Sequence, residues 1–252
     1  THCRYNLIEY AAFFGSIQII RYLFKNGVTL SSDLWKYAMH CQNQELIDFL
    51  ETNQVEQTDN NEYDLLYYSI KYHNVNMTNY MINNYFYNVR NFDKYFEMAC
   101  KNSNFDFFDK IQINETCFYY LCKYNYYKIV QFFVKNINFD INSGPDSPLN
   151  AAIKKGNINL AKTLISIKNI NVNKVSEIDG KTALTIAIND GQTEIAKLLL
   201  ARNDIDVNTM AIVRDFHDHG NFEIENKLSP IILAIGKDIE IVKLLLSFDN
   251  ID

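Results

Sequence analysis

Three short clusters in this 252-residue chain hold residue types that can do chemistry. The first is Gly180-Lys181-Thr182, which resembles the end of a phosphate-binding loop. Such a loop needs a glycine five residues before Gly180, and the chain has Val175 at that position. A tight turn followed by a helix cap at Thr182 explains the same residues, so we expect no phosphate site.

The second cluster is a pair of cysteines, Cys117 and Cys122, which lie five residues apart. A zinc site usually takes four ligands, often as two closely spaced pairs of cysteine or histidine. The chain offers no second cysteine pair and no histidine at ligand spacing. We therefore interpret both residues as core cysteines and not as metal ligands.

The third cluster lies in the segment 215–225, which combines two histidines with acidic residues. His217 and His219 would share one face of a strand, and Asp215 would add an oxygen donor. This arrangement is workable for a metal but unspecific, and surface loops usually expose such residues to solvent. An exposed loop is the favoured interpretation, so we expect no metal and no other cofactor.

The elements that must position these residues are pairs of short helices, and the clearest pair lies between Asp179 and Asn208. Thr182 can cap a first helix over residues 183–189, and Gly191 follows where a left-handed residue is favoured. A second helix is predicted from Thr193, and residues 202–206 would form an extended finger to the next unit. Neither helix is long enough to be stable alone, so the unit must stack on copies of itself.

Weaker copies of this unit can be aligned on one small residue of the first helix, which is Ala187 in the clearest copy. The aligned positions are Ala11, Ala38, Ser69, Ala99, Leu121, Ala152, Ala187 and Ala234. Their spacing ranges from 22 to 47 residues, around the ~33 residues of a short helical repeat. The chain is therefore predicted to be a repeat array.

The three C-terminal copies carry the most specific sequence. They read Ser147-Pro148-Leu149-Asn150-Ala151-Ala152, Thr182-Ala183-Leu184-Thr185-Ile186-Ala187 and Ser229-Pro230-Ile231-Ile232-Leu233-Ala234. All three resemble the Thr-Pro-Leu-His-x-Ala motif of the ankyrin repeat, with a hydroxyl at the N-cap of the first helix. The histidine of that motif is replaced by Asn150, Thr185 and Ile232. The resemblance covers Asn6 to Leu246 and implies an all-α, ankyrin-type helix-turn-helix solenoid of about eight repeats, joined by short hairpin fingers.

The copies within residues 1–146 keep the pattern but lose the motif. The turn glycine becomes His73, Ser103 or Asn125, and bulky rings replace small residues between Ser69 and Val134. Such rings should open the spacing between helices, so this half is expected to curve differently or to fold less cooperatively.

We predict a single elongated domain over residues 1–252, because no linker rich in glycine, serine or proline divides the chain. The clear copies occupy residues 147–252 and include an insertion at about 209–227, which we interpret as an extended finger. Leu244, Leu245 and Leu246 end the array without a polar cap, so we expect the chain to be part of a longer protein.

Composition favours some partners and compartments over others. The formal net charge of −6 disfavours nucleic acid, because a short basic stripe cannot supply distributed phosphate neutralisation. No apolar run reaches the ~18 residues needed to span a bilayer. Five cysteines at irregular spacing indicate free thiols in a reducing compartment, so an intracellular protein of the cytoplasm or nucleus is expected.

The family resemblance singles out a surface made by the finger tips and by the last two residues of each first helix, which we call the ridge pairs. The ridge pairs are Phe13-Phe14, His40-Cys41, Lys71-Tyr72, Lys101-Asn102, Lys123-Tyr124, Lys154-Lys155 and Asn189-Asp190. Four successive pairs contain lysine, which would form a positive stripe suited to an acidic partner segment. The helix dipole also favours lysine at these positions by at most ~1 kcal/mol, so the stripe has a structural explanation as well. Asp179 and Lys181 in a finger are secondary candidates.

The sequence as a whole is typical of a non-catalytic protein-protein interaction module that binds its partner on the concave face of a solenoid. No serine, histidine and acid set and no paired carboxylates stand in a recognisable catalytic frame, so no enzymatic activity and no small-molecule substrate are expected. The alternative is a structural spacer or an autoregulatory arm within a larger polypeptide. A third interpretation, in which the histidines of the insertion bind a metal, has less support.

Overall fold

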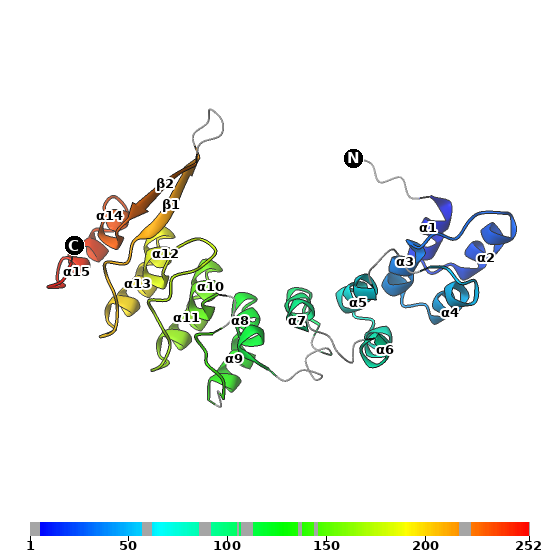
Figure 1. Cartoon of the computed structure of the whole chain (residues 1–252), viewed down its shortest axis with the longest axis horizontal. Coiled ribbons are helices and arrows are strands. Elements are labelled where there is room, and N and C mark those ends of the chain that lie inside the picture. Colours follow the sequence, from blue (N-terminus) through cyan, green and yellow to red (C-terminus); the bar gives the residue numbers. More distant parts are fainter. Residues whose placement is uncertain are drawn as a thin grey trace. The chain divides into compact units, whose positions relative to one another are not determined.

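The chain folds into two compact units of short helices, Thr1–Gln112 and Ile113–Asp252 (Figure 1). The structure is a computed structural model that describes residues 6–56, 62–85, 92–104, 106, 113–135, 138–143, 146–216 and 223–251. That the two units form one continuous domain stays a prediction.

The first unit contains helices α1 to α7. Their bounds are Leu7–Phe13 (α1), Ile17–Lys25 (α2), Leu34–Cys41 (α3), Gln44–Thr52 (α4), Glu62–Lys71 (α5), Val75–Tyr85 (α6) and Phe92–Lys101 (α7). The first helices of successive pairs, α1, α3, α5 and α7, pack against one another in chain order.

The second unit contains helices α8 to α15 and two strands. The bounds are Glu115–Lys123 (α8), Tyr127–Val134 (α9), Pro148–Lys154 (α10), Ile158–Ile165 (α11), Ala183–Asn189 (α12), Thr193–Leu200 (α13), Ala211–Phe216 (β1), Glu223–Leu228 (β2), Pro230–Ala234 (α14) and Ile239–Leu245 (α15). Here α8, α10, α12 and α14 are the first helices and pack in chain order, while α9, α11, α13 and α15 form a second row (Figure 1).

The small residues used to align the copies form the contact between neighbouring first helices. All eight aligned residues lie in first helices, and each is at most 5% exposed. A small side chain at this position lets adjacent helix axes approach closely, so the repeat pattern read from the sequence is confirmed. The core cysteines Cys117 and Cys122 are buried on α8, as predicted.

Side chains cap the first helices of the clear copies in two cases out of three. Thr182 and Thr185 form a reciprocal capping box on α12, and Ser147 accepts a hydrogen bond from the backbone N–H of Asn150. Ser229 is the N-cap residue of α14, as predicted, but its hydroxyl makes no capping hydrogen bond to the helix. Asn150 stands at the position of the histidine in the ankyrin motif, and its buried amide donates to the carbonyls of Lys174 and Lys181 in the next finger.

The turns between helices require a left-handed residue in both units. Gly15, Gly156 and Gly191 adopt φ values of 66°, 69° and 68° in these turns. His73, Ser103 and Asn125 adopt φ values of 56°, 56° and 61° at the equivalent places, as their alignment with glycine predicts. A residue with a side chain is strained in this region, so the turn geometry is set by the repeat and not by glycine alone.

A ladder of asparagine side chains connects successive fingers of the second unit. Asn142 donates to the carbonyl of Asn169 and accepts from the backbone N–H of Asn171, at 2.8 and 2.7 Å. Asn173 repeats this arrangement one finger later with Asp204 and Asp206, at 2.6 and 2.8 Å. The third rung is Asn208, whose amide donates to the carbonyl of Asn250. The recurring Asp/Asn-Ile/Val-Asn sequence is therefore the part of each finger that sets the spacing between repeats.

The insertion before the last repeat forms a β-hairpin. Strands β1 and β2 pair antiparallel, from Ala211 opposite Leu228 to Phe216 opposite Glu223. The hairpin also contacts the preceding finger, because the backbone N–H of Ile212 donates to the carbonyl of Gly180 at 3.4 Å. The extended finger expected from the sequence is thus a paired hairpin, while His217 and His219 lie outside the described residues.

Helices account for nearly all regular structure in the described part of the chain, which confirms the all-α class. Within those residues, no helix has the length and apolar character needed to cross a membrane.

Candidate protein-binding surface

The ridge pairs of the first unit carry a continuous row of stacked rings. Phe13 of α1 stacks on His40 of α3 with ring centroids 4.2 Å apart, and His40 meets the edge of Tyr72 at 4.8 Å. The row ends on solvent at Phe14, which is 61% exposed and packs against Tyr10. Three consecutive repeats therefore contribute a ring from their ridge pairs to one connected row.

Lysine side chains lie against these rings. The Lys71 ammonium is 5.3 Å from the ring centroid of Tyr72 and 5.8 Å from that of Tyr67. At this distance the cation is attracted to the face of the ring, by about 0.5–1 kcal/mol at an exposed site. Lys101, at the end of α7, is exposed.

The second unit begins its ridge with a similar group around Lys123. The Lys123 ammonium lies 5.4 Å from the ring centroid of Tyr120, 5.5 Å from Tyr124 and 5.9 Å from Tyr119. The predicted pairs Lys71-Tyr72 and Lys123-Tyr124 are thus brought together as cation and ring. The helix dipole favours a lysine at these positions but does not favour a tyrosine ring beside it, so the dipole alone does not explain both pairs.

Lys154 occupies a ridge position but points into the fingers. Its ammonium lies 3.5 Å from the carboxylate of Asp146, 3.2 Å from the Ser176 hydroxyl and 3.1 Å from the carboxylate of Asp179. The Asp146 side chain is only 2% exposed, and Ser176 is also buried. We call Lys154, Asp146, Ser176 and Asp179 the finger cluster. It binds two successive fingers together, so Lys154 has a structural role that the sequence did not reveal.

Two other candidates from the sequence are placed differently. Lys155, beside Lys154, is exposed on the ridge. Lys181 lies in the finger turn, where its carbonyl accepts the backbone N–H of Ser176 at 2.9 Å and one N–H of Asn150 at 3.3 Å. Of the residues 71, 72, 101, 123, 124, 154, 155, 179 and 181 singled out in the sequence, only Lys154 and Asp179 meet in an ion pair.

Hydrogen bonds and nearby charges in the fingers lower the pKa of three aspartates. Burial by itself would raise the pKa of Asp179, but hydrogen bonds with Ser176 and Lys154 and the Lys154 charge lower it below its usual value. The pKa of Asp204 is lowered by its hydrogen bond with Arg202, and that of Asp206 by its hydrogen bond with Thr209. All three carboxylates belong to the second unit and favour their ionised form in the folded state.

We therefore expect the second unit to lose stability in acid. Because these pKa values are lower in the folded state than the usual ~3.9, their contribution is present above about pH 4 and is lost as the pH falls through the lowered values. The measurement is urea unfolding followed by circular dichroism between about pH 5 and pH 3. Asp179→Asn should lose less stability over this range than the native chain. Parallel curves for Asp179→Asn and the native chain would contradict the assignment.

The repeat geometry agrees with the comparison to known protein families. A family model described as ankyrin repeats, three copies, matches residues 96–176 and 118–211. The chain contains ankyrin repeats. The matched residues begin within α7 of the first unit and run through the second unit as far as the start of β1, so they include two of the three C-terminal copies of the motif. A search among curated proteins found no match to the chain.

Successive second helices share a pattern of ion pairs that the sequence reasoning missed. A basic residue at the fifth position of one second helix pairs with an acidic residue at the second position of the next. The pairs are Arg21–Glu45 at 2.9 Å, Lys162–Glu194 at 2.5 Å and Lys197–Glu240 at 2.5 Å. Aligning the second helices, in addition to the first, would have revealed this signal. These ion pairs connect second helices, whereas the ridge pairs lie at the ends of first helices.

Proposed function

We propose that this ankyrin-repeat chain is a non-catalytic protein-interaction module that binds partner segments along its ridge pairs, on the face that is concave in this family. The observation that carries the proposal is the aromatic row of the first unit, in which Phe13 and Phe14 are exposed and Lys71 lies against the half-buried Tyr72. Aromatic residues are enriched at protein interfaces, where they bury large area at low entropic cost. A row of rings built by stacked repeats can follow an extended partner chain.

Electrostatics support an acidic segment as the partner of the lysines. Lys71, Lys101 and Lys155 are at ridge positions, and none of them forms an ion pair with an acidic side chain among the described residues. Acidic residues of a partner would find these charges available for pairing. Lys154 is left out of this set, because its charge is already used in the finger cluster.

The experiment is affinity enrichment from a lysate of the source cell. It compares the native chain with a variant in which Lys71, Lys101, Lys123 and Lys155 are changed to Glu and Lys154 is kept. The matched control reverses four exposed lysines off the ridge: Lys94, Lys128, Lys168 and Lys243. Both variants change the net charge equally, and circular dichroism establishes that both are folded.

We expect particular partners to be retained by the native chain and the control variant and to be lost from the ridge variant. Loss from both variants would indicate a general charge effect and would contradict recognition by the ridge. If neither the native chain nor the variants retain a partner, the spacer or autoregulatory-arm alternative is favoured. These outcomes separate a binding ridge from lysines placed only by the helix dipole.

A further inference from the structure

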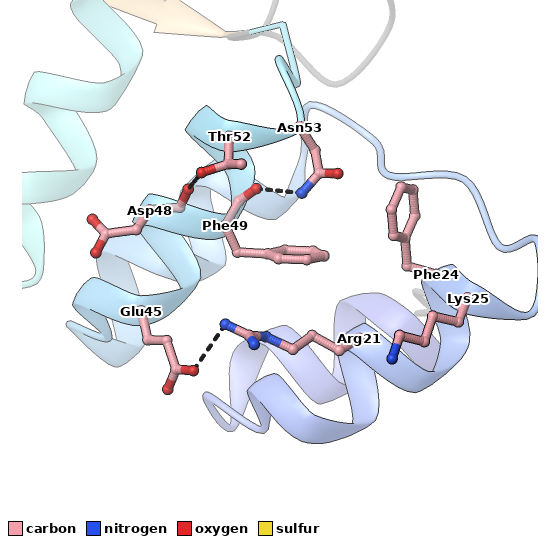
Figure 2. A pocket seen from close by; sticks show the side chains of 8 residues that line it. All are labelled: Arg21, Phe24, Lys25, Glu45, Asp48, Phe49, Thr52 and Asn53. Carbon is pink, nitrogen blue, oxygen red and sulfur yellow. Dashed lines mark hydrogen bonds and ion pairs between the residues drawn. The ribbon is translucent and has the colours of Figure 1, made fainter.

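A groove between second helices of the first unit lies away from the ridge pairs. It is a cavity of about 520 Å³ between α2 and α4 (Figure 2). This volume is within the ~300–1,000 Å³ that small ligands and single side-chain clusters occupy. We call it the α2–α4 groove.

The floor of this groove is aromatic. Phe24 of α2 and Phe49 of α4 meet edge to face with centroids 5.7 Å apart, and Phe24 remains 38% exposed. The guanidinium of Arg21 lies 5.6 Å from the Phe49 ring centroid and is held by its ion pair with Glu45. The floor is therefore an apolar surface open to solvent, and the ion pair of Arg21 with Glu45 fixes one side of the groove.

The same groove recurs in the second unit with a different floor. Between α13 and α15, equivalent positions hold Leu200 and Leu244, beside the ion pair of Lys197 with Glu240. Leu200 is only 7% exposed, in contrast to Phe24 at the matching position. Stacking of repeats thus produces both grooves, and the second is lined by one partly exposed ring, Phe248, where the first has the pair Phe24 and Phe49.

The two ends of the α2–α4 groove differ in charge. Figure 2 shows the Lys25 and Phe24 side chains at one end and the Asp48 carboxylate at the other. Asp48 accepts a hydrogen bond from Gln44 at 2.8 Å, and Arg21 is paired with Glu45. Lys25 is exposed and forms no ion pair within the part of the chain that the structure describes. Two charges of the groove are thus outside this ion pair: Lys25, which lies at the same end as the exposed ring of Phe24, and Asp48 at the opposite end.

We propose that the α2–α4 groove binds a partner protein segment in which an aromatic residue adjoins an acidic one. The aromatic ring extends the edge-to-face arrangement of Phe24 and Phe49, and the carboxylate pairs with Lys25. This surface is separate from the ridge pairs, so the chain could hold two segments at once. The proposal does not depend on the ridge being used.

The test is a titration of the full chain with acetyl-Phe-Glu-amide, followed by the NMR signals of the phenylalanine ring of the peptide. Control peptides are acetyl-Phe-Gln-amide, which lacks the charge, and acetyl-Ala-Glu-amide, which lacks the ring. The protein variants are Lys25→Gln and, as a matched control in the groove between α13 and α15, Lys243→Gln. Both substitutions are at exposed side chains, so neither should alter folding.

We expect acetyl-Phe-Glu-amide to bind the native chain and Lys243→Gln equally, and Lys25→Gln about two- to fivefold more weakly, as one exposed ion pair predicts. Acetyl-Phe-Gln-amide should bind the native chain and Lys25→Gln alike, and acetyl-Ala-Glu-amide should lose most binding. Equal binding of the acidic peptide to Lys25→Gln, or undiminished binding of the alanine peptide, overturns the proposal. Weakening by Lys243→Gln alone would place the peptide in the other groove and also overturns it.

Discussion

Replacing Lys154 with Met is expected to destabilise the second unit by about 3 kcal/mol, although Lys154 stands at a ridge position with a partly exposed side chain. The reason is the buried carboxylate of Asp146, which lies 3.5 Å from the Lys154 ammonium. Without the lysine, this charge stays in a site from which water is largely excluded, with only the hydroxyl of Ser176 and the backbone N–H of Ser147 as donors. Methionine keeps most of the packing volume, so the loss measures the charge and not a cavity.

The exposed neighbour Lys155 provides the matched control. Lys155→Met should change the free energy of unfolding by no more than about 0.5 kcal/mol, as exposed substitutions usually do. Unfolding in urea is followed by circular dichroism, while the fluorescence of Trp35, the single tryptophan, reports on the first unit. Asp146→Asn combined with Lys154→Met should recover part of the loss, because it removes the uncompensated charge. An unchanged midpoint for Lys154→Met would show that the finger cluster contributes nothing to stability.

The helix pairs were predictable because each local signal agreed with the repeat. Thr182, the helix over 183–189, the turn at Gly191 and the second helix from Thr193 all appear at the expected residues. His73 and Asn125 could be placed in left-handed turns for the same reason, since the alignment assigned them the position of a glycine. Information that recurs with the repeat period is therefore accessible from the sequence alone.

The ridge was predictable as a set of positions but not as a set of contacts. The lysines 71 and 123 lie against tyrosines as their spacing on one helix allows, whereas Lys154 turns away towards the fingers. Its partner Asp179 is 25 residues away, in a segment whose path depends on the finger turn. Identical positions in two repeats can thus place a lysine against the ridge tyrosines in one and into the finger cluster in the other, and only the finger path distinguishes them.

Ser229 takes the N-cap position of α14 that its sequence predicts, but its hydroxyl does not bond to the helix. Its sequence matches that of Ser147, but Ser229 directly follows β2 of the hairpin and not a short finger. The chain thus enters α14 from a strand. An insertion changes the entry path of a helix without changing the motif that marks its start.

Replacing Gly180 with Ala is expected to destabilise the second unit by about 2–3 kcal/mol, through two effects at one residue. Gly180 has φ +64°, where a side chain costs about 1 kcal/mol. A Cβ atom there would also lie 2.5 Å from Cδ1 and 2.8 Å from Cγ1 of Ile212, which is closer than such atoms approach one another, and 3.1 Å from its Cβ. Ile212 is the residue through which β1 contacts the finger, so its side chain or the hairpin must shift.

Gly191→Ala separates the two effects, because Gly191 has φ +68° and open space around the position of a new Cβ. It should cost only the backbone term, about 1 kcal/mol, and the difference from Gly180→Ala is then the collision with Ile212. Adding Ile212→Ala to each glycine variant completes a double-mutant cycle. We expect Ile212→Ala to relieve about 1 kcal/mol of the Gly180→Ala loss and to add its own cost in full to Gly191→Ala. Equal losses for the two glycine variants would mean that the hairpin does not rest on the finger at Gly180, and that its position is set by the β1–β2 pairing and α14 alone.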